Sequence, residues 1–331
     1  MSVFSRLYGS VIAARNHAFD HGWKKVRRLK HPVVSVGNLS VGGSGKTPFL
    51  LMLGKLLQER GIAFDILSRG YGRSDSRIRL VDEKGSAELY GDEPLVLAQN
   101  LHVPVIVGPD RYKAGLYAEQ EFSDLKPAHG VWLHLLDDGF QHRQLARDFD
   151  ILIVRPEDST EELLPSGYLR EPVASLKRAD AIVLTEGATT EGLSIVKQHV
   201  WRVTRRIELD PTQPDFPKKP FVLCSIARPE RFVNDLRAKG VDVVGQALYP
   251  DHYKFVESDI RAICEQVHKL GADGILTTEK DAMRLAPFRA ALEESARLIT
   301  VPLVMELVDP KQALDVILGT VAERLRCEMA D

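Results

Sequence analysis

The chain has 331 residues, of which 44% are hydrophobic and 27% are charged, and its formal net charge is −2. This composition is typical of a globular protein with about two domains and excludes a disordered or fibrous chain. The near-neutral charge gives no general attraction to nucleic acid, so we expect no such partner. The three cysteines lack metal-ligand spacing, which indicates a reducing compartment, and there is neither a cleavable signal nor an apolar run of the roughly 18 residues that span a bilayer.

Residues 1–30 form the first predicted element, an amphipathic segment. Apolar side chains recur at approximately helical spacing from Phe4 to Val26, and seven basic residues lie between Arg6 and Lys30. Such a segment lies either on a membrane surface or on the core of its own protein. The density of basic residues beside Trp23 favours the membrane.

The next element is an apolar strand that begins at Val33 and leads into a glycine-rich turn and a predicted buried helix, 49–57. The turn ends in Gly-Lys-Thr, which predicts a loop that binds the phosphates of a nucleoside triphosphate. Lys46 is expected to reach the β and γ phosphates and the Thr47 hydroxyl to ligate Mg²⁺. The first glycine of the usual pattern is replaced by Ser40, so flexibility must come from Gly42 and Gly43. The predicted nucleotide-binding residues are Gly42, Gly43, Ser44, Gly45, Lys46 and Thr47.

Strands and helices alternate along the following residues. Strands are predicted at 62–67, 103–107, 131–136, 151–154 and 181–184, and a small inserted hairpin at 77–90. This alternation predicts a P-loop NTPase-like α/β domain over 31–200 with a mainly parallel sheet, whose ligand lies at the carboxyl ends of the strands. Alternation from Trp201 to Leu209 and the four prolines that follow predict an extended linker over 201–220.

A second α/β domain is predicted over 221–305. Its strands are expected at 221–226, 241–244, 274–277 and 298–303, and its helices at 229–239 and 258–270. An amphipathic helix over 311–326 belongs to the last segment, 306–331, which can pack on either domain. The sequence pattern therefore predicts two α/β units and leaves the packing of the terminal helix undecided.

Candidate metal-binding and catalytic residues follow the predicted strand at 131–136. It ends in Asp137 and Asp138, as a Walker B strand does to hold a metal ion or its waters. Gln141 and His142 come next and are placed to orient a substrate, although an isolated histidine is often structural. Asp92 and Glu93 are ordinarily explained as favourable charges in the first turn of a helix, and the residues alone favour that interpretation. Further on, Pro250-Asp251-His252-Tyr253 offers a carboxylate and an imidazole, and His252 reaches the first domain only if the two units face one another across a cleft.

These motifs together are more specific than any one of them, and they occur in order over nearly the whole chain, at 37–48, 68–73, 91–94, 137–143, 169–172, 250–253 and 277–281. The set resembles the tetraacyldisaccharide 4′-kinase family of lipid A biosynthesis. The resemblance implies transfer of the γ-phosphoryl group of ATP to the 4′-hydroxyl of a tetraacylated glucosamine disaccharide 1-phosphate, with Mg²⁺ as cofactor. It also implies a peripheral protein on the cytoplasmic face of the inner membrane, which we expect to be a monomer. The fold that it implies is two α/β/α units with mainly parallel sheets, joined by a two-stranded linker.

The resemblance assigns roles residue by residue. It implies that Asp92 is the catalytic base, that His252 assists it, and that Lys46 and Asp138 complete the catalytic set. The implied metal ligands are Thr47, Asp137, Asp138 and Glu171. The residues implied to line the substrate are Tyr71, Glu93, Arg111, Gln141, His142 and Arg170.

Two other classes compete with this interpretation. A membrane-associated regulatory ATPase of the deviant Walker type also combines a glycine-rich loop with amphipathic helices, but carries an extra early lysine where this chain has Ser40 and Val41. A nucleotide-gated scaffold has no need of the Asp92 and His252 pair. Both alternatives predict nucleotide binding without phosphorylation of a lipid.

Overall fold

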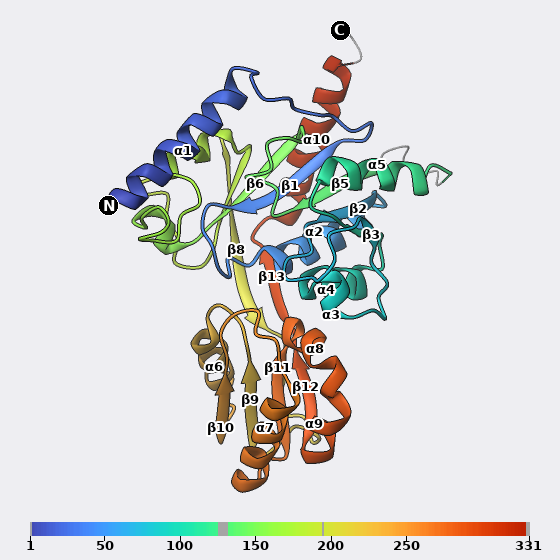
Figure 1. Ribbon diagram of the computed structural model, residues 1–331, viewed down its shortest axis with the longest axis vertical. Helices are drawn as coiled ribbons and strands as arrows, with labels where there is room; N and C mark the ends of the chain where they lie inside the picture. The colour runs from blue at the N-terminus through green and yellow to red at the C-terminus, as the bar shows by residue number, and fades with distance from the viewer. Residues whose placement is uncertain (1, 125–131, 194, 329–331) are drawn as a thin grey trace.

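The computed structural model describes residues 2–124, 132–193 and 195–328. Within these residues the chain forms two lobes, one around a nine-stranded sheet and one around a four-stranded sheet (Figure 1). Most neighbouring strands are parallel, and helices cover the sheets. The predicted α/β class with two mainly parallel sheets is therefore confirmed.

The larger lobe carries most of the elements. Its strands are β1 (Val33–Asn38), β2 (Ala63–Ser68), β3 (Arg79–Leu80), β4 (Val105–Val107), β5 (Trp132–Asp137), β6 (Phe149–Val154), β7 (Ala181–Leu184), β8 (His199–Ile207) and β13 (Leu303–Leu307). Its helices are α1 (Val3–Asp20), α2 (Lys46–Glu59), α3 (Ala87–Tyr90), α4 (Asp92–Leu101), α5 (Arg111–Glu121) and α10 (Pro310–Glu328), with 3₁₀ turns at Pro156–Ser159 and Val173–Arg178. The strand order is β13-β8-β7-β6-β1-β5-β2-β4-β3. Residue 131, which the predicted strand 131–136 includes, lies outside the described residues.

The centre of this sheet positions the site. Strands β1 and β5 are buried along their whole length, as expected of apolar strands covered by helices on both faces. They pair in parallel, with Val34 opposite Leu135 and Val36 opposite Asp137. The glycine-rich loop after β1 and the two aspartates at the end of β5 therefore emerge side by side.

The smaller lobe is a parallel sheet of order β10-β9-β11-β12. Its strands are β9 (Pro220–Cys224), β10 (Gly245–Leu248), β11 (Gly274–Thr278) and β12 (Arg297–Val301). Its helices are α6 (Pro229–Ala238), α7 (Glu257–Leu270), α8 (Glu279–Leu285) and α9 (Arg289–Ser295), with a 3₁₀ turn at Ala286–Phe288. Buried apolar side chains on both faces of this sheet give the lobe its own core.

The chain passes between the lobes twice, along β8 and β13. These strands pair antiparallel, with Leu303 opposite Ile207 and Leu307 opposite Val203, at the edge of the larger sheet (Figure 1). The first part of the stretch expected as a linker, 201–207, is thus a strand of the larger sheet. The alternation that suggested a connector arises because every second side chain of β8 is buried near its middle.

Three local predictions are wrong. Residues 77–90 do not form a hairpin, because β3 pairs with β4 and residues 87–90 form α3. The strand expected at 241–244 begins only at Gly245, because the apolar residues before it pack into the core while the backbone of 245–248 pairs with β9. The strand expected at 298–303 is two strands in different sheets, divided at Pro302, which lacks a backbone N–H.

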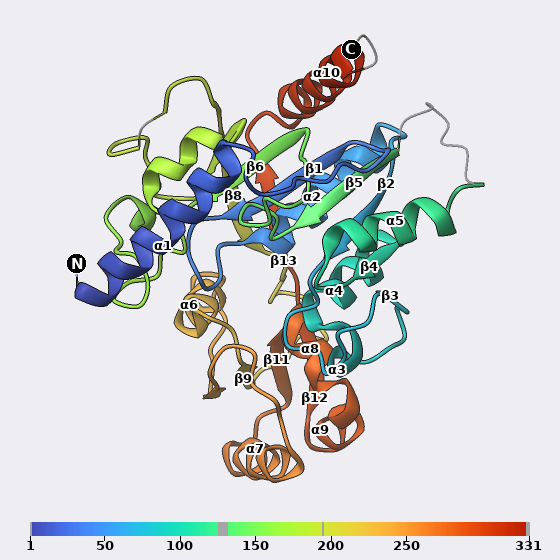
Figure 2. The same ribbon diagram turned by 45° about the horizontal axis from the view of Figure 1, so that its top comes forward.

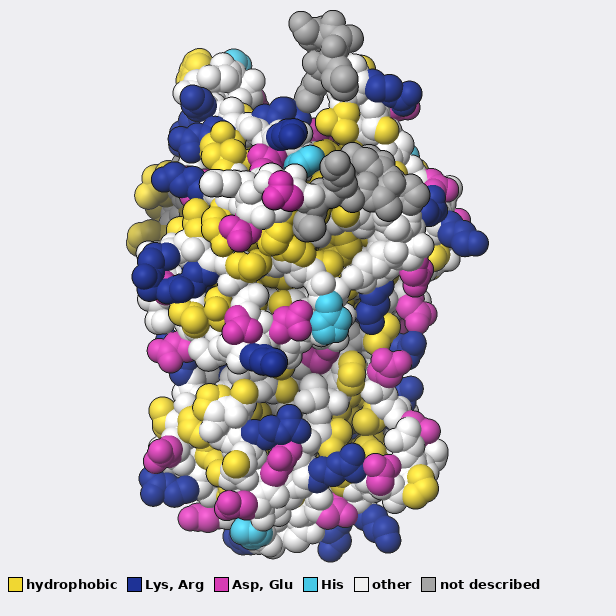
Figure 3. Space-filling model, turned by 90° about the vertical axis from the view of Figure 1, so that its right-hand side faces the viewer, with side chains coloured by type: hydrophobic (Ala, Val, Ile, Leu, Met, Phe, Trp, Pro, Cys, Tyr) yellow, Lys and Arg dark blue, Asp and Glu magenta, His cyan; other side chains and the backbone are white. Residues whose placement is uncertain are grey.

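The terminal helices differ in their packing. Helix α10 buries Ala313, Leu314, Ile317 and Val321 in the core of the larger lobe, which decides the question that the sequence left open. Helix α1 lies on the opposite flank from α5 (Figure 2) and buries only Ser5 and Phe19, whereas Val3, Phe4, Leu7 and Val11 are exposed. Among the described residues, no helix combines the length and the apolar character needed to cross a bilayer. The flank with α5 shows basic and acidic side chains interspersed over both lobes (Figure 3).

Candidate active site

A cavity of about 830 Å³ lies between the lobes. The glycine-rich loop and the end of β5 line it from the larger lobe, and the residues around His252 and Lys280 line it from the smaller lobe. Thirteen predicted site residues line this cavity: Gly42, Gly43, Ser44, Gly45, Lys46, Thr47, Tyr71, Glu93, Asp137, Asp138, Gln141, Arg170 and His252. One cavity thus brings together residues that are more than 200 positions apart in the sequence.

The glycine-rich loop joins β1 to the first turn of α2. Gly42 and Gly45 have φ angles of +89° and +87°, which other residues rarely adopt. A Cβ atom on Gly45 would also lie 2.3 Å from the Cε of Met305. Ser40 instead precedes the turn and pairs with Leu169 in a β-bridge, and its φ angle is not positive, so the backbone at the first position of the motif does not require glycine.

Lys46 points toward the end of β5. Its Nζ lies 3.2 Å from the Oδ1 of Asn38 and 3.4 Å from the Oδ1 of Asp138. The Nη1 of Arg170 donates a hydrogen bond of 2.8 Å to the other oxygen of Asp138. Burial by itself would raise the pKa of Asp138, but these two cations lower it to about 2. Asp138 is therefore ionised at neutral pH.

Asp137 is held differently. The Ser68 hydroxyl donates to its Oδ2 at 2.7 Å, and its Oδ1 is buried without a partner. Burial, followed by the charges of Glu93 and Asp138, raises the pKa of Asp137 to about 6. The two adjacent carboxyl groups thus concentrate negative charge that an arriving cation can balance.

The donors at this edge of the sheet fit a magnesium–triphosphate group. The Ser44 hydroxyl and the Oδ1 of Asp137 are buried without a hydrogen-bond partner, the Oδ1 of Asp138 has only its ion pair with Lys46, and the Thr47 side chain is also buried. Oxygen donors of this kind suit Mg²⁺. Within the described residues, no cluster of three or more His, Cys, Asp or Glu that could hold a metal ion is found.

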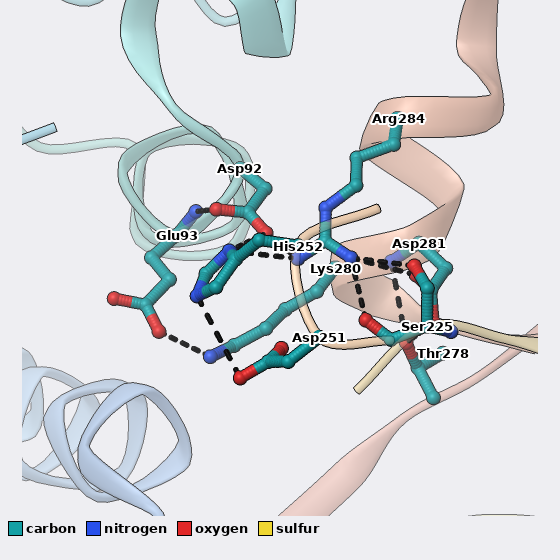
Figure 4. A network of polar contacts seen from close by, with 9 residues as sticks. All are labelled: Asp92, Glu93, Ser225, Asp251, His252, Thr278, Lys280, Asp281 and Arg284. Atoms are coloured by element: carbon teal, nitrogen blue, oxygen red, sulfur yellow. Dashed lines mark hydrogen bonds and ion pairs between the residues drawn. The ribbon is translucent and has the colours of Figure 1, made fainter. Parts of the chain in front are cut away.

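Asp92 does not line the cavity, but His252, which contacts it, does. Figure 4 shows the polar contacts around Asp92. Asp92 lies in the first turn of α4, where its Oδ2 is 3.4 Å from the Nδ1 of His252 and forms an ion pair with Arg284. Burial would raise the pKa of Asp92, but His252, Arg284 and Lys280 lower it well below its usual range. The hydrogen bond to Asp92 raises the pKa of His252, although burial opposes the shift. The facing arrangement on which the predicted pair depends is present in this structure.

Neighbouring groups surround this pair. Glu93 forms an ion pair with Lys280 of the smaller lobe, and the ring of Tyr71 packs against His252 with 5.0 Å between centroids. Asp138 and His252 both have left-handed backbone conformations, with φ angles of 50° and 57°. Non-glycine residues in this region cost energy and gather at functional sites.

Three predicted residues lie elsewhere in the described structure. Both oxygens of Glu171 are bound, by Arg178 at 2.8 and 3.1 Å and by Asn16 at 2.8 Å, and its role as a metal ligand stays a prediction. Arg111 is buried and donates to the carbonyl of Pro109. His142 is half-buried, and burial followed by the charge of Arg111 lowers its pKa to about 4. These side chains support the walls of the site rather than line it.

Sequence reasoning missed four partners: Asn38, Ser68, Lys280 and Arg284. A signal for the last two was present, because they are four residues apart in a short helix that follows a strand, and so share one face. The partners of Lys46 and Asp137 had a weaker signal, since polar residues at the carboxyl ends of β1 and β2 precede the site loops. Position at a strand end is what these residues share.

Comparisons with known proteins agree with this geometry. Residues 1–322 match the family model of tetraacyldisaccharide-1-P 4′-kinase, LpxK. The chain is 45% identical over 331 residues to a tetraacyldisaccharide 4′-kinase from Koribacter versatilis, covering 98% of this chain and 99% of that one. It is 37% identical over 296 residues to the same enzyme from Aquifex aeolicus, covering 85% and 88%.

A solved structure is also similar. The crystal structure of LpxK from Aquifex aeolicus in complex with ATP matches with a TM-score of 0.74 and 32% identity, covering 96% of this chain and 97% of that one. The similarity extends over both lobes and hence over the cavity between them. The chain therefore belongs to the tetraacyldisaccharide 4′-kinase family and is an ATP-binding kinase of lipid A biosynthesis.

Proposed function

We propose that the cavity between the lobes is where the γ-phosphoryl group of ATP passes to the 4′-hydroxyl of a tetraacylated disaccharide 1-phosphate. One observation carries this proposal: the glycine-rich loop of the larger lobe and His252 of the smaller lobe line the same cavity, and Asp92 of the larger lobe lies against His252. A scaffold or a regulatory ATPase has no use for a carboxylate–imidazole pair held together across its two lobes beside the phosphate loop. The relative from Aquifex aeolicus, which was crystallised with ATP, supports ATP as the donor.

The residues divide into two groups by task. Lys46 and the loop N–H groups bind the phosphates of ATP, and Arg170 adds positive charge beside Asp138. Asp92, assisted by His252, takes the proton of the acceptor hydroxyl. As the new oxygen–phosphorus bond forms, the bond from the γ-phosphorus to the bridging oxygen breaks, and its electron pair leaves with ADP. Positioning and charge stabilisation supply most of the rate in such transfers.

Thr47, Asp137 and Asp138 are the residues that would hold Mg²⁺. When bound, the ion would neutralise charge on the phosphate oxygens. Glu93, Tyr71 and Gln141 line the same cavity and are proposed to contact the acceptor sugar or its phosphate. Because the two lobes of one chain complete this set, the proposal is that the enzyme acts as a monomer.

Phosphoryl transfer tests the proposal directly. With γ-labelled ATP, Mg²⁺ and the disaccharide 1-phosphate in detergent, the purified chain should yield a labelled, doubly phosphorylated lipid. Removal of divalent cations with EDTA should abolish the label, and added Mg²⁺ should restore it. Folded protein that binds ATP but never labels the lipid, or labels it equally well in EDTA, would contradict the proposal.

The membrane is proposed to be contacted by α1, on the cytoplasmic face of the inner membrane. Val3, Phe4, Leu7 and Val11 are 59–79% exposed on this helix, and basic side chains follow it. Exposed apolar side chains beside basic ones suit a surface of anionic lipid. This contact would bring the site to an acceptor that remains in the bilayer.

Replacing two of the exposed apolar side chains of α1 with aspartate tests whether this helix contacts the membrane. The double variant Phe4→Asp and Leu7→Asp should sediment with anionic phospholipid vesicles at least about tenfold less than the parent, because it loses apolar burial and adds negative charge. Val256→Asp, at a position 52% exposed on the smaller lobe, is the control and should sediment like the parent. Undiminished sedimentation of the double variant would exclude α1 as the contact.

A further inference from the structure

The guanidinium of Arg284 lies where the two lobes meet (Figure 4). It extends from α8 of the smaller lobe, and its side chain is only 9% exposed. Its Nη2 contacts the Oδ2 of Asp92 and lies 3.1 Å from the Nδ1 of His252. A single nitrogen therefore touches both members of the proposed base pair.

The other side of this guanidinium is anchored within the smaller lobe. The Nη1 of Arg284 donates to the carbonyl oxygen of Ser225 at 2.8 Å, to the Ser225 hydroxyl at 2.7 Å and to the Oδ1 of Asp281 at 2.9 Å. Asp281 is fully buried and also accepts from the backbone N–H of Ser225 at 3.0 Å and from the Thr278 hydroxyl at 2.7 Å. A buried and satisfied network of this kind is rigid. Arg284 therefore moves with the smaller lobe.

Asp92 depends on this cation for both its orientation and its charge. Its Oδ1 accepts the backbone N–H of Glu93 at 2.9 Å, and its Oδ2 is shared between Arg284 and His252. Burial alone would raise the pKa of Asp92, and the neighbouring cations reverse that shift. Loss of Arg284 would leave His252 and Lys280 as the remaining neighbours that lower the pKa of Asp92, and would therefore raise that pKa.

The other charged groups around Asp92 do not replace Arg284. Lys280 lowers the pKa of Asp92 too, but its Nζ is committed to the ion pair with Glu93. Asp251 lies on the far side of His252, 3.8 Å from its Nε2. Neither group touches Asp92 and His252 together.

We propose that Arg284 is a positioning residue for the phosphoryl transfer, which aligns Asp92 with His252 and keeps the carboxylate ionised while the lobes are together. This inference rests on the proposed base role of Asp92. It couples the two halves of the molecule chemically, because the residue that prepares the base of the larger lobe belongs to the smaller lobe. When the lobes separate, the base loses the cation that sustains it.

Two substitutions at this position separate charge from geometry. Arg284→Gln should lower kcat at least about tenfold with the KM for ATP within about threefold of the parent. It should also move the acid limb of the kcat/KM profile to higher pH by about one unit or more, because loss of the cation raises the pKa of Asp92. Arg284→Lys should lower kcat but leave the limb in place, since an ammonium keeps the charge and cannot form the same fork of contacts.

Controls exclude a general effect on folding. Arg289→Gln removes an exposed arginine that pairs with Glu293 on α9, and it should match the parent in rate, pH profile and unfolding midpoint. Should Arg284→Gln fail to fold, Ser225→Ala provides the test, because it loosens the anchor and keeps the cation. If Ser225→Ala lowers kcat without changing the KM for ATP, the proposal is supported. If Ser225→Ala has the same kcat and KM as the parent, the proposal is overturned.

Asp92→Asn, assayed in parallel, separates this inference from the proposed function. If Asp92→Asn keeps the parent rate, the base role itself fails. If Asp92→Asn is inactive while Arg284→Gln has the parent rate and profile, only the role of Arg284 fails. A slower Arg284→Gln variant with an unmoved acid limb also overturns the proposal, because a merely structural residue would behave in that way.

Discussion

Replacing Asp92 with asparagine is expected to lower turnover by about 10² or more while leaving ATP affinity nearly unchanged. Asparagine preserves the size of the side chain but cannot take the proton of the acceptor hydroxyl. The phosphate-binding loop lies on another element and keeps its contacts, so the loss should appear in kcat. Initial rates of lipid phosphorylation and equilibrium binding of ATP measure the two quantities separately.

The control for this variant is Asp242→Asn, at an exposed carboxylate of the smaller lobe. It should retain the parent rate. An Asp92→Asn variant that works as fast as the parent would assign proton removal to another group, and one that loses ATP binding as well would show that Asp92 also holds the phosphate loop in place.

A second large effect is expected from Lys46→Gln, which should reduce kcat/KM by about 10² to 10³. Lys46 reaches from the first turn of α2 to Asn38 and Asp138, at the edge where phosphate charge would collect. Glutamine carries no charge to spread over the transferred group. Loss of Lys46 also removes one of the two cations that hold the pKa of Asp138 low.

Lys55→Gln is the matched control, because it makes the same chemical change at an exposed position on the same helix. It should retain parent kinetics and parent ATP affinity. Steady-state rates over a range of ATP concentrations distinguish weaker binding from slower transfer. If Lys46→Gln were no slower than Lys55→Gln, the loop would bind something other than the reacting phosphates.

The nucleotide side of the site was predictable because its signal is local. A strand, a glycine-rich turn and a helix are contiguous over residues 33–59, and each positive φ angle falls on a glycine. The Asp137–Asp138 pair was predictable for the same reason, since it terminates a strand that parallel pairing places beside the loop. Local pattern was therefore sufficient for this half of the cavity.

The contacts of Glu171 and Arg284 were not predictable in this way. Motif position implied a metal ligand at Glu171, but it gave no sign that Arg178 and Asn16 donate to its oxygens. Arg284 belongs to no phosphate motif, yet it contacts a residue 192 positions away. Such contacts depend on how whole elements pack and leave little trace in spacing along the chain.

By itself, the sequence determined the α/β class, the phosphate loop, the paired aspartates and, through the ordered motifs, the family. Only the tertiary structure decided that β8 and β13 share one sheet, that α10 returns to the larger lobe, and that a cation of the smaller lobe holds Asp92. The physical reason is the separation along the chain over which each kind of interaction acts. Strand propensity and turn chemistry act over a few residues, whereas burial and ion pairing join groups that the chain itself keeps far apart.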